Sequence, residues 1–412
     1  MAAPSAKPVA VNNDGSNTVE LKSKTRVAPL NRADDAAKSA TRLSRRHRHQ
    51  AKAAAKSAEN AEQSESRMKT ALVLGGGAPN MALMAGALAA FNKRGITFDV
   101  VSTSGAGSVI GLLWLAPKDM PPDEALENVV NLSVSDLIYN QFPVNYKVFN
   151  KPGDLASMYR QFLASIPGMS HIVNQYPMNE MQRLWSDWLQ LGWASMCPSN
   201  LSASSWGMCA PLPFIENVVD FDKIKNVAPY FYLNAYNMTN EVMDDFPKEV
   251  LTVDHFRAAL AFPFIYGPYK LNGCEYYEGA VRDCLNFKDL CEKHTGIETI
   301  VVFDVLGSDS LIRAPRSLYD SWVLSMIIPL VETAEDDLRL FALLHNNGYK
   351  RSEGAKADLL KVQFDIPDEF LPDALDWSSS NARRLFKIGY EAGLKFCDDH
   401  HAELAKTVTK AK

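Results

Sequence analysis

The 412-residue sequence lacks the features that mark several large classes of protein. It has no run of about 18 consecutive apolar residues, so no transmembrane helix is expected. Its N-terminus has no apolar segment typical of a secretory signal. Neither C-x-x-C nor H-E-x-x-H occurs, and the eight histidines form no ligand-like cluster. We therefore expect no metal site, no organic cofactor and no Ser–His–Asp triad.

Cysteine is also sparse. The six cysteines are scattered between Cys197 and Cys397, a distribution typical of free thiols in a reducing compartment. A disulfide between Cys197 and Cys209 is the alternative that the spacing leaves open. We predict a cytoplasmic protein, with peripheral attachment to a membrane or granule surface as an extension that depends on the charge of the N-terminus.

Charge is uneven along the chain. The whole sequence has a net charge of -5, whereas residues 1–69 hold 14 Lys/Arg and 7 Asp/Glu. Residues 38–56 carry seven basic side chains and no acidic one. Residues 1–66 have almost no aromatic side chains and cannot bury enough apolar surface to offset the entropy of folding. We predict a disordered basic tail that either has no specific task or attaches to an anionic surface; no specific nucleic-acid site is expected.

From Met68 onward the apolar pattern alternates between short buried strands and helices. Consecutive strand–turn–helix units form right-handed crossovers, and these build parallel sheets. The sequence therefore predicts an α/β domain over residues 67–412 with a mainly parallel sheet. The expected strands are Thr70–Gly75, Ile96–Ser102, Tyr230–Met238, Glu298–Gly307 and a last one near 359–367; helices are expected after the first two strands and over 253–262, 316–346 and 379–407.

An aromatic-rich insertion at about 120–225 interrupts this alternation. It contains four tryptophans between Met178 and Cys209. Two interpretations are open: ordinary core, or an apolar lid with a pocket for acyl chains.

A candidate nucleophile follows the second predicted strand, in the string Ser102-Thr103-Ser104-Gly105-Ala106. A serine on a strand-to-helix turn can attack a carbonyl if small neighbours allow the bend and a base takes its proton. The pattern G-x-S-x-G is absent, but every neighbour of Ser104 is small. Ser102 and Gly105 are the supporting positions. An ordinary turn serine is the alternative.

A glycine triplet after the first strand complements this serine. The backbone N–H groups of Gly75, Gly76 and Gly77 could form an oxyanion hole, because glycine leaves the approach to the backbone open. The triplet has neither the G-x-G-x-x-G spacing nor the G-K-[ST] ending of a nucleotide-binding loop.

Together, the motif "LVLGGGAPNMALMAGAL" and the Ser104 turn resemble the opening of a patatin-like phospholipase domain. That family uses a Ser–Asp dyad to hydrolyse acyl esters of lipids. The segment "FRAALAFPFIYGPYKLNGCEYYEGAVRDCLNF" resembles the family's third motif, and it places Glu278-Gly279-Ala280 where D-G-G or D-G-A is expected. The resemblance implies a three-layer patatin-like sandwich, with Ser104 and Glu278 as the catalytic pair and Gly279 in support.

All three motifs depart from the family pattern. In the elbow, Ser102 replaces a glycine and the second glycine is shifted; in the oxyanion loop, Pro79 replaces a basic residue and Asn80 replaces a glycine; in the third motif, Glu278 replaces the aspartate. The resemblance implies a serine acyl hydrolase that cleaves carboxylic esters of a lipid or similar apolar ester through an acyl-enzyme on Ser104. Two alternatives remain open: a catalytically impaired patatin-like protein that binds lipid or a protein partner, and an acyltransferase. Asp283 is a second carboxylate near the motif, for which we expect a turn or capping role.

Overall fold

The computed structural model describes residues 69–404 with interruptions. The chain divides into two compact units, Met1–Ala61 and Glu62–Lys412, and the described residues belong to the second. The predicted disordered tail, Pro79 and Cys209 lie outside the described residues. The interruptions are 78–79, 144, 149–150, 152–153, 170–178, 199–217, 264–265, 288–289, 291–292, 295, 304, 306–313, 316–317, 347–356 and 368–375.

The described strands form one mixed sheet of eight strands in the order β5-β6-β3-β2-β1-β7-β8, with β4 also paired to β3. The pairs β3–β2, β2–β1, β1–β7 and β7–β8 are parallel, whereas β4, β5 and β6 join in antiparallel orientation. The predicted α/β class and the mainly parallel sheet are confirmed. The strands are β1 Thr70–Leu74, β2 Val100–Thr103, β3 Tyr230–Asn237, β4 Val242–Pro247, β5 Tyr269–Leu271, β6 Cys274–Glu278, β7 Thr299–Phe303 and β8 Asp358–Lys361.

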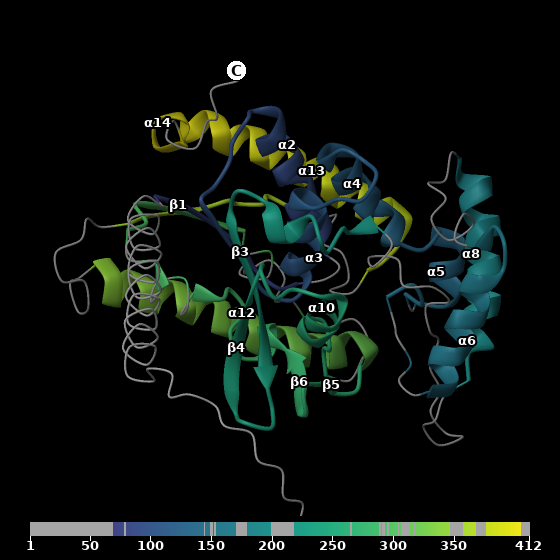
Figure 1. Cartoon of the computed structure of the whole chain (residues 1–412). Helices are drawn as coiled ribbons and strands as arrows, with labels where there is room; N and C mark the ends of the chain where they lie inside the picture. The colour runs from purple at the N-terminus through teal and green to yellow at the C-terminus, as the bar shows by residue number, and fades with distance from the viewer. Residues whose placement is uncertain are drawn as a thin grey trace, which may run out of the picture. The chain divides into compact units, whose positions relative to one another are not determined.

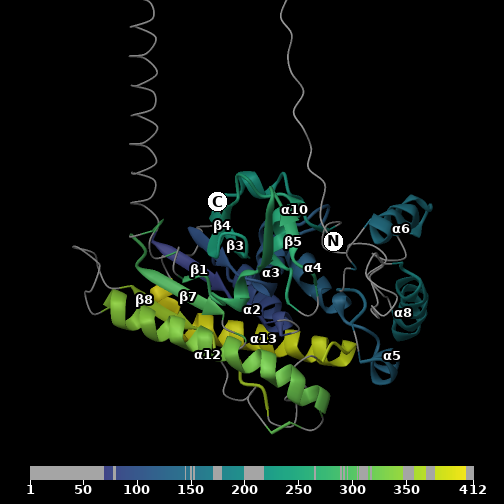
Figure 2. The same ribbon diagram turned by 90° about the horizontal axis from the view of Figure 1, so that it is seen from below.

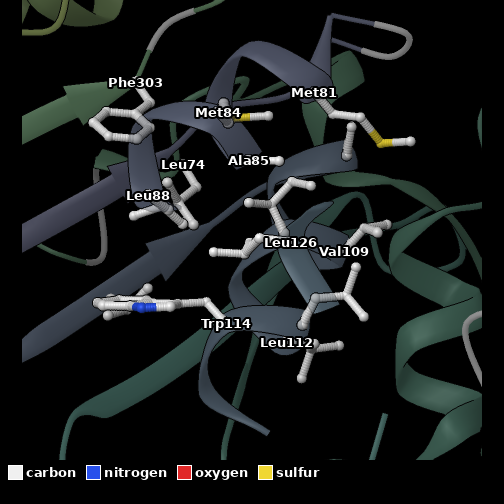
Figure 3. Packing of buried hydrophobic residues seen from close by; sticks show 14 of the residues in the cluster. Leu74, Met81, Met84, Ala85, Leu88, Val109, Leu112, Trp114, Leu126 and Phe303 are labelled. Atoms are coloured by element: carbon white, nitrogen blue, oxygen red, sulfur yellow. The ribbon is translucent and has the colours of Figure 1, made fainter. Parts of the chain in front are cut away.

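Helices cover both faces of the sheet. The side chains of a strand alternate between its two faces, so the apolar residues of a strand such as β1 need a covering layer on each side. In β1, Leu72 and Leu74 join the core beneath α2 (Met81–Lys93), α3 (Ala106–Leu115) and α13 (Ser379–Asp399). Ala71 and Val73 face the opposite core, which α12 (Leu318–Asn346) covers. Figure 1 shows α2 and α13 on one side of the sheet and α12 on the other. This is the three-layer arrangement that the resemblance to the patatin-like family implied, and Figure 3 shows side chains of the first core packed together.

Helices α2 and α13 pack at backbone distance. A Cβ added at Gly86 would lie 2.0 Å from the carbonyl oxygen of Phe386, and one added at Gly389 would lie 2.1 Å from that of Leu83. Small residues are therefore required on both helices. The "GYEAG" string of the closing helix supplies two of them, Gly389 and Gly393.

The aromatic-rich insertion is helical where it is described. Figure 2 shows α5, α6 and α8 as neighbours. No described helix is long and apolar enough to cross a membrane. The remaining elements are α4 Pro122–Glu127, η1 Asn128–Leu132, α5 Asp136–Gln141, α6 Asp154–Ser165, α8 Glu180–Ser195, η2 Ile224–Asn226, α10 Val253–Ala259, η3 Gly279–Val281 and α14 His401–Leu404.

Candidate functional site

The candidate site lies at the turn between β2 and α3, beside the carboxyl end of β1. Two residues, Ser104 and Gly105, connect the strand to the helix. Gly107 has to be small, because a Cβ there would lie 2.0 Å from the carbonyl oxygen of Leu74. The sharp bend falls on Gly105, whose φ of 47° and ψ of -123° are disfavoured for residues with a side chain.

Ser104 occupies the last position of the extended segment, ahead of the bend. Its side chain is fully buried, and its Oγ donates a hydrogen bond to the backbone carbonyl of Asp283 at 3.0 Å. Its N–H donates to the carbonyl of Leu74 at 3.0 Å. The side-chain hydroxyl and the backbone N–H of Ser104 therefore both hold the turn to neighbouring backbone.

Glu278 ends β6 and lies under the bend. Its N–H donates to the carbonyl of Ala261 at 3.0 Å, and only 8% of the residue is exposed. Burial raises the pKa of the Glu278 carboxyl to about 8. The carboxylate faces residue 105: a Cβ built on Gly105 would lie 2.0 Å from Glu278 Oε1. The acidic side chain therefore fills the space that a side chain at the bend would need.

The glycine triplet follows β1, as expected, but two of its three N–H groups are already paired. Gly75 donates to the carbonyl of Phe303 at 3.2 Å, and Gly76 donates to that of Cys284 at 3.1 Å. Among the described residues, no acceptor pairs with the N–H of Gly77, whose φ is 126°. The Cβ position of Gly76 lies 3.9 Å from Glu278 Oε1, so the triplet does border the carboxylate.

The other two supporting positions named from the sequence, Ser102 and Gly279, have structural partners. The Ser102 hydroxyl donates to the carbonyl of Asn286 at 3.0 Å. Gly279 makes room for Asn234, since a Cβ there would lie 2.1 Å from Asn234 Oδ1.

Asp283 closes the turn after η3. Its carbonyl accepts hydrogen bonds from Ser104 Oγ and from Asn234 Nδ2, each at 3.0 Å, and its carboxylate accepts one from the N–H of Asn286. Burial and the neighbouring Asp283 raise the pKa of Asp337 on α12 to about 7. The capping role expected for Asp283 agrees with these contacts. Sequence reasoning missed Asp337, which lies 54 positions further along the chain and carries no motif.

The described histidines have other surroundings. His294 stacks on the ring of Tyr232 and meets the ring of Tyr230 edge-on, and burial lowers its pKa to about 4. His255 Nδ1 lies 2.8 Å from the hydroxyl oxygen of Thr252. Within the described part of the chain, no group of His, Cys, Asp and Glu side chains could hold a metal ion. The four described cysteines, Cys197 included, are free.

Comparison with known proteins identifies the family. The model of the family "Patatin-like phospholipase" matches residues 72–290, more than half of the chain and all three motifs. The protein belongs to the patatin-like phospholipase family, whose members are generally lipid acyl hydrolases.

Among solved structures, one match is VipD from Legionella pneumophila. It has 12% sequence identity and a TM-score of 0.35, and the match covers 81% of this chain and 67% of VipD. No curated protein matches the chain in sequence.

Proposed function

We propose that this protein is a patatin-family member with an impaired catalytic centre, and that it binds a lipid or similarly apolar ester without efficient hydrolysis. The observation that carries the proposal is the position of the bend. A nucleophile elbow presents its side chain from the strained residue between strand and helix. Here that residue is Gly105, which has no side chain.

The register of the glycines supports this interpretation. In G-x-S-x-G the last glycine follows the nucleophile by two positions. Gly107 follows Gly105 by two and approaches Leu74 closely, as a required glycine does. The string Thr103-Ser104-Gly105-Ala106-Gly107 then aligns with the motif, and glycine stands in the place of the nucleophile.

The surroundings of Ser104 add to the argument. A serine nucleophile needs a base within about 2.6–3.2 Å of its hydroxyl. The Ser104 hydroxyl instead donates to a backbone carbonyl, which cannot accept the proton during attack. The Glu278 carboxylate points at the bend, and the pairing of Gly75 and Gly76 reduces the donors left for an oxyanion.

Hydrolysis through an acyl-enzyme on Ser104, with Glu278 as the base and Gly75, Gly76 and Gly77 as the oxyanion hole, is the second candidate. It is favoured by family membership and by the pKa of Glu278, since a carboxyl with a pKa of about 8 exchanges its proton near neutral pH.

Labelling with a fluorophosphonate probe distinguishes the two. We expect no labelling of the wild-type protein and none of Ser104→Ala. Wild-type labelling that Ser104→Ala abolishes would overturn the proposal and establish the second candidate.

The double variant Gly105→Ser/Glu278→Asp tests the position directly. The shorter acid draws the carboxylate back from the Cβ position at residue 105, which lies 2.0 Å from Glu278 Oε1, and leaves a carboxylate facing a serine at the bend. We expect this variant to gain labelling, and Gly105→Ser alone to gain less, because Glu278 still occupies the space. Adding Ser104→Ala to the double variant should leave the gained labelling unchanged. If the triple variant loses this labelling, the nucleophile is Ser104 and not the residue at position 105.

A further inference from the structure

The first part of helix α8 is inverted relative to an ordinary surface helix, because Arg183 and Asp187 point inward whereas Trp185 and Trp188 point outward. Its last turn is ordinary, with Leu191 and Ala194 buried. Arg183 and Asp187 are buried, with 7% and 1% of each residue exposed. Trp185 and Trp188 are 64% and 50% exposed. An ordinary surface helix buries its apolar stripe and exposes its charged side chains.

Specific contacts hold α8 in this orientation. Asp187 forms an ion pair with Lys147 at 2.7 Å and accepts a hydrogen bond from the N–H of Ser135 at 2.7 Å. Arg183 donates to Ser379 Oγ on α13 at 2.6 Å. Breaking such a buried pair is costly, because one charge would stay buried without its partner. The helix therefore cannot rotate its tryptophans inward without losing this network.

Helix α6 carries a second apolar stripe beside the first. The two helices are joined by Tyr159, whose hydroxyl donates to the carbonyl of Trp193 at 3.0 Å. Leu155, Met158 and Phe162 repeat at helical spacing on α6, and all three are at least half exposed. We call the exposed apolar side chains of α6 and α8 the apolar stripes. They are Leu155, Met158 and Phe162 on α6 and Met181, Trp185, Trp188 and Leu189 on α8.

Exposed charge is almost absent from these helices beyond their first residues. Arg183 and Asp187 are buried, and the Arg160 guanidinium donates to the carbonyl of Lys151. Asp154 and Glu180, at the two N-termini, are exposed. A surface of tryptophan, phenylalanine, leucine and methionine without interspersed charge suits the boundary between lipid headgroups and acyl chains. Binding at that boundary requires apolar side chains but no specific hydrogen bonds or ion pairs.

Charge complementarity to a bilayer comes from the N-terminal sequence. The seven basic residues of 38–56 attract anionic headgroups, and stable peripheral attachment usually takes two such signals. From these observations we propose that the apolar stripes of α6 and α8 dock the protein onto the surface of a lipid bilayer. The docking does not depend on whether the turn at Gly105 is catalytic.

Vesicle flotation of the full chain tests the proposal. The probes are vesicles of phosphatidylcholine alone and of phosphatidylcholine with phosphatidylserine, each at low and high salt. We expect binding to both, stronger on the anionic vesicles at low salt, with a component that persists at high salt, since salt screens the tail but not apolar contact.

The double variant Trp185→Ala/Trp188→Ala should lower the salt-resistant partition coefficient about tenfold or more, from the burial of two large side chains. The control Trp322→Ala removes a half-exposed tryptophan from α12 and should leave binding unchanged. Unchanged binding of the double variant would overturn the proposal. So would a wild-type protein that avoids vesicles but forms dimers that the double variant loses, because the stripes would then bind a second copy. Fluorophosphonate labelling is independent of either result.

Discussion

The sheet core and the α6–α8 pair use the same residue types in opposite ways. Strand β1 is buried along its whole length, and Trp114 of α3 packs inside the core. On α8, Trp185 and Trp188 are exposed, and the helix is held by a buried ion pair and hydrogen bonds. Apolar side chains thus stabilise the fold in the sheet core, whereas on α6 and α8 they remain exposed at the surface. The ion network of α8 specifies an orientation that apolar burial alone would reverse.

Removing one charge of that network tests the contrast most strongly. Asp187→Ala leaves Lys147 buried without its partner, and we expect a loss of about 3–5 kcal/mol in the free energy of unfolding. Urea unfolding measures the change. The matched variant Gln190→Ala, at a buried neutral position of the same helix, should lose less. Equal losses for the two variants would contradict a special role for the ion pair.

Alanine substitutions at two glycines, Gly86 in the core and Gly192 on α8, compare the packing of the two regions at single positions. Gly86→Ala places a Cβ 2.0 Å from the Phe386 carbonyl oxygen and should destabilise the protein by about 3 kcal/mol, as overpacking of a core does. Gly192→Ala on α8 meets nothing within 4 Å and should stabilise by about 0.5–1 kcal/mol through helix propensity. Thermal unfolding of both variants gives the comparison, and destabilisation by Gly192→Ala would mean that a partner segment covers this side of α8.

Glu278 provides a pH-dependent test of the sheet region, because burial raises the pKa of its carboxyl. The folded state holds the Glu278 proton up to about pH 8, and the unfolded chain releases it near 4.5. This contribution to stability is complete below pH 4.5 and is lost as pH rises toward 8, by at most about 1.4 kcal/mol per pH unit. Glu278→Gln should flatten that part of the profile. An unchanged slope would mean that Glu278 is ionised in the folded protein.

The strand and helix pattern of the sequence predicted the main architecture. Apolar runs and helical spacing located β1, α2, α3, β3 and α12 to within a few residues, because burial imposes a period on each element. The closing helix begins where predicted, but α13 ends at Asp399 and the short α14 follows it. Strands β4, β5 and β6 were missed. Polar residues interrupt them, and they pair in antiparallel register, β4 and β6 with β3 and β5 with β6, which no local pattern encodes.

The candidate site could be located in the sequence, but not its geometry. The motifs brought together the correct segments: Gly76 and Gly105 both lie beside Glu278. Chemistry drew attention to Ser104 because serine has a hydroxyl, whereas the bend falls one residue later. A one-residue difference of register turns a side chain from one side of the backbone to the other, so composition could not decide it. The spacing to Gly107 was the available signal.

The sequence by itself determined the α/β class, the family and the neighbourhood of the site, since these follow from local periodicity and from motifs at fixed spacing. Only the tertiary structure decided which residue occupies the bend, where the Glu278 carboxylate points, and which side of α8 is exposed. These depend on contacts between segments far apart in the chain. Asp283 fixes Ser104, Lys147 and Ser135 fix Asp187, and Ser379 fixes Arg183.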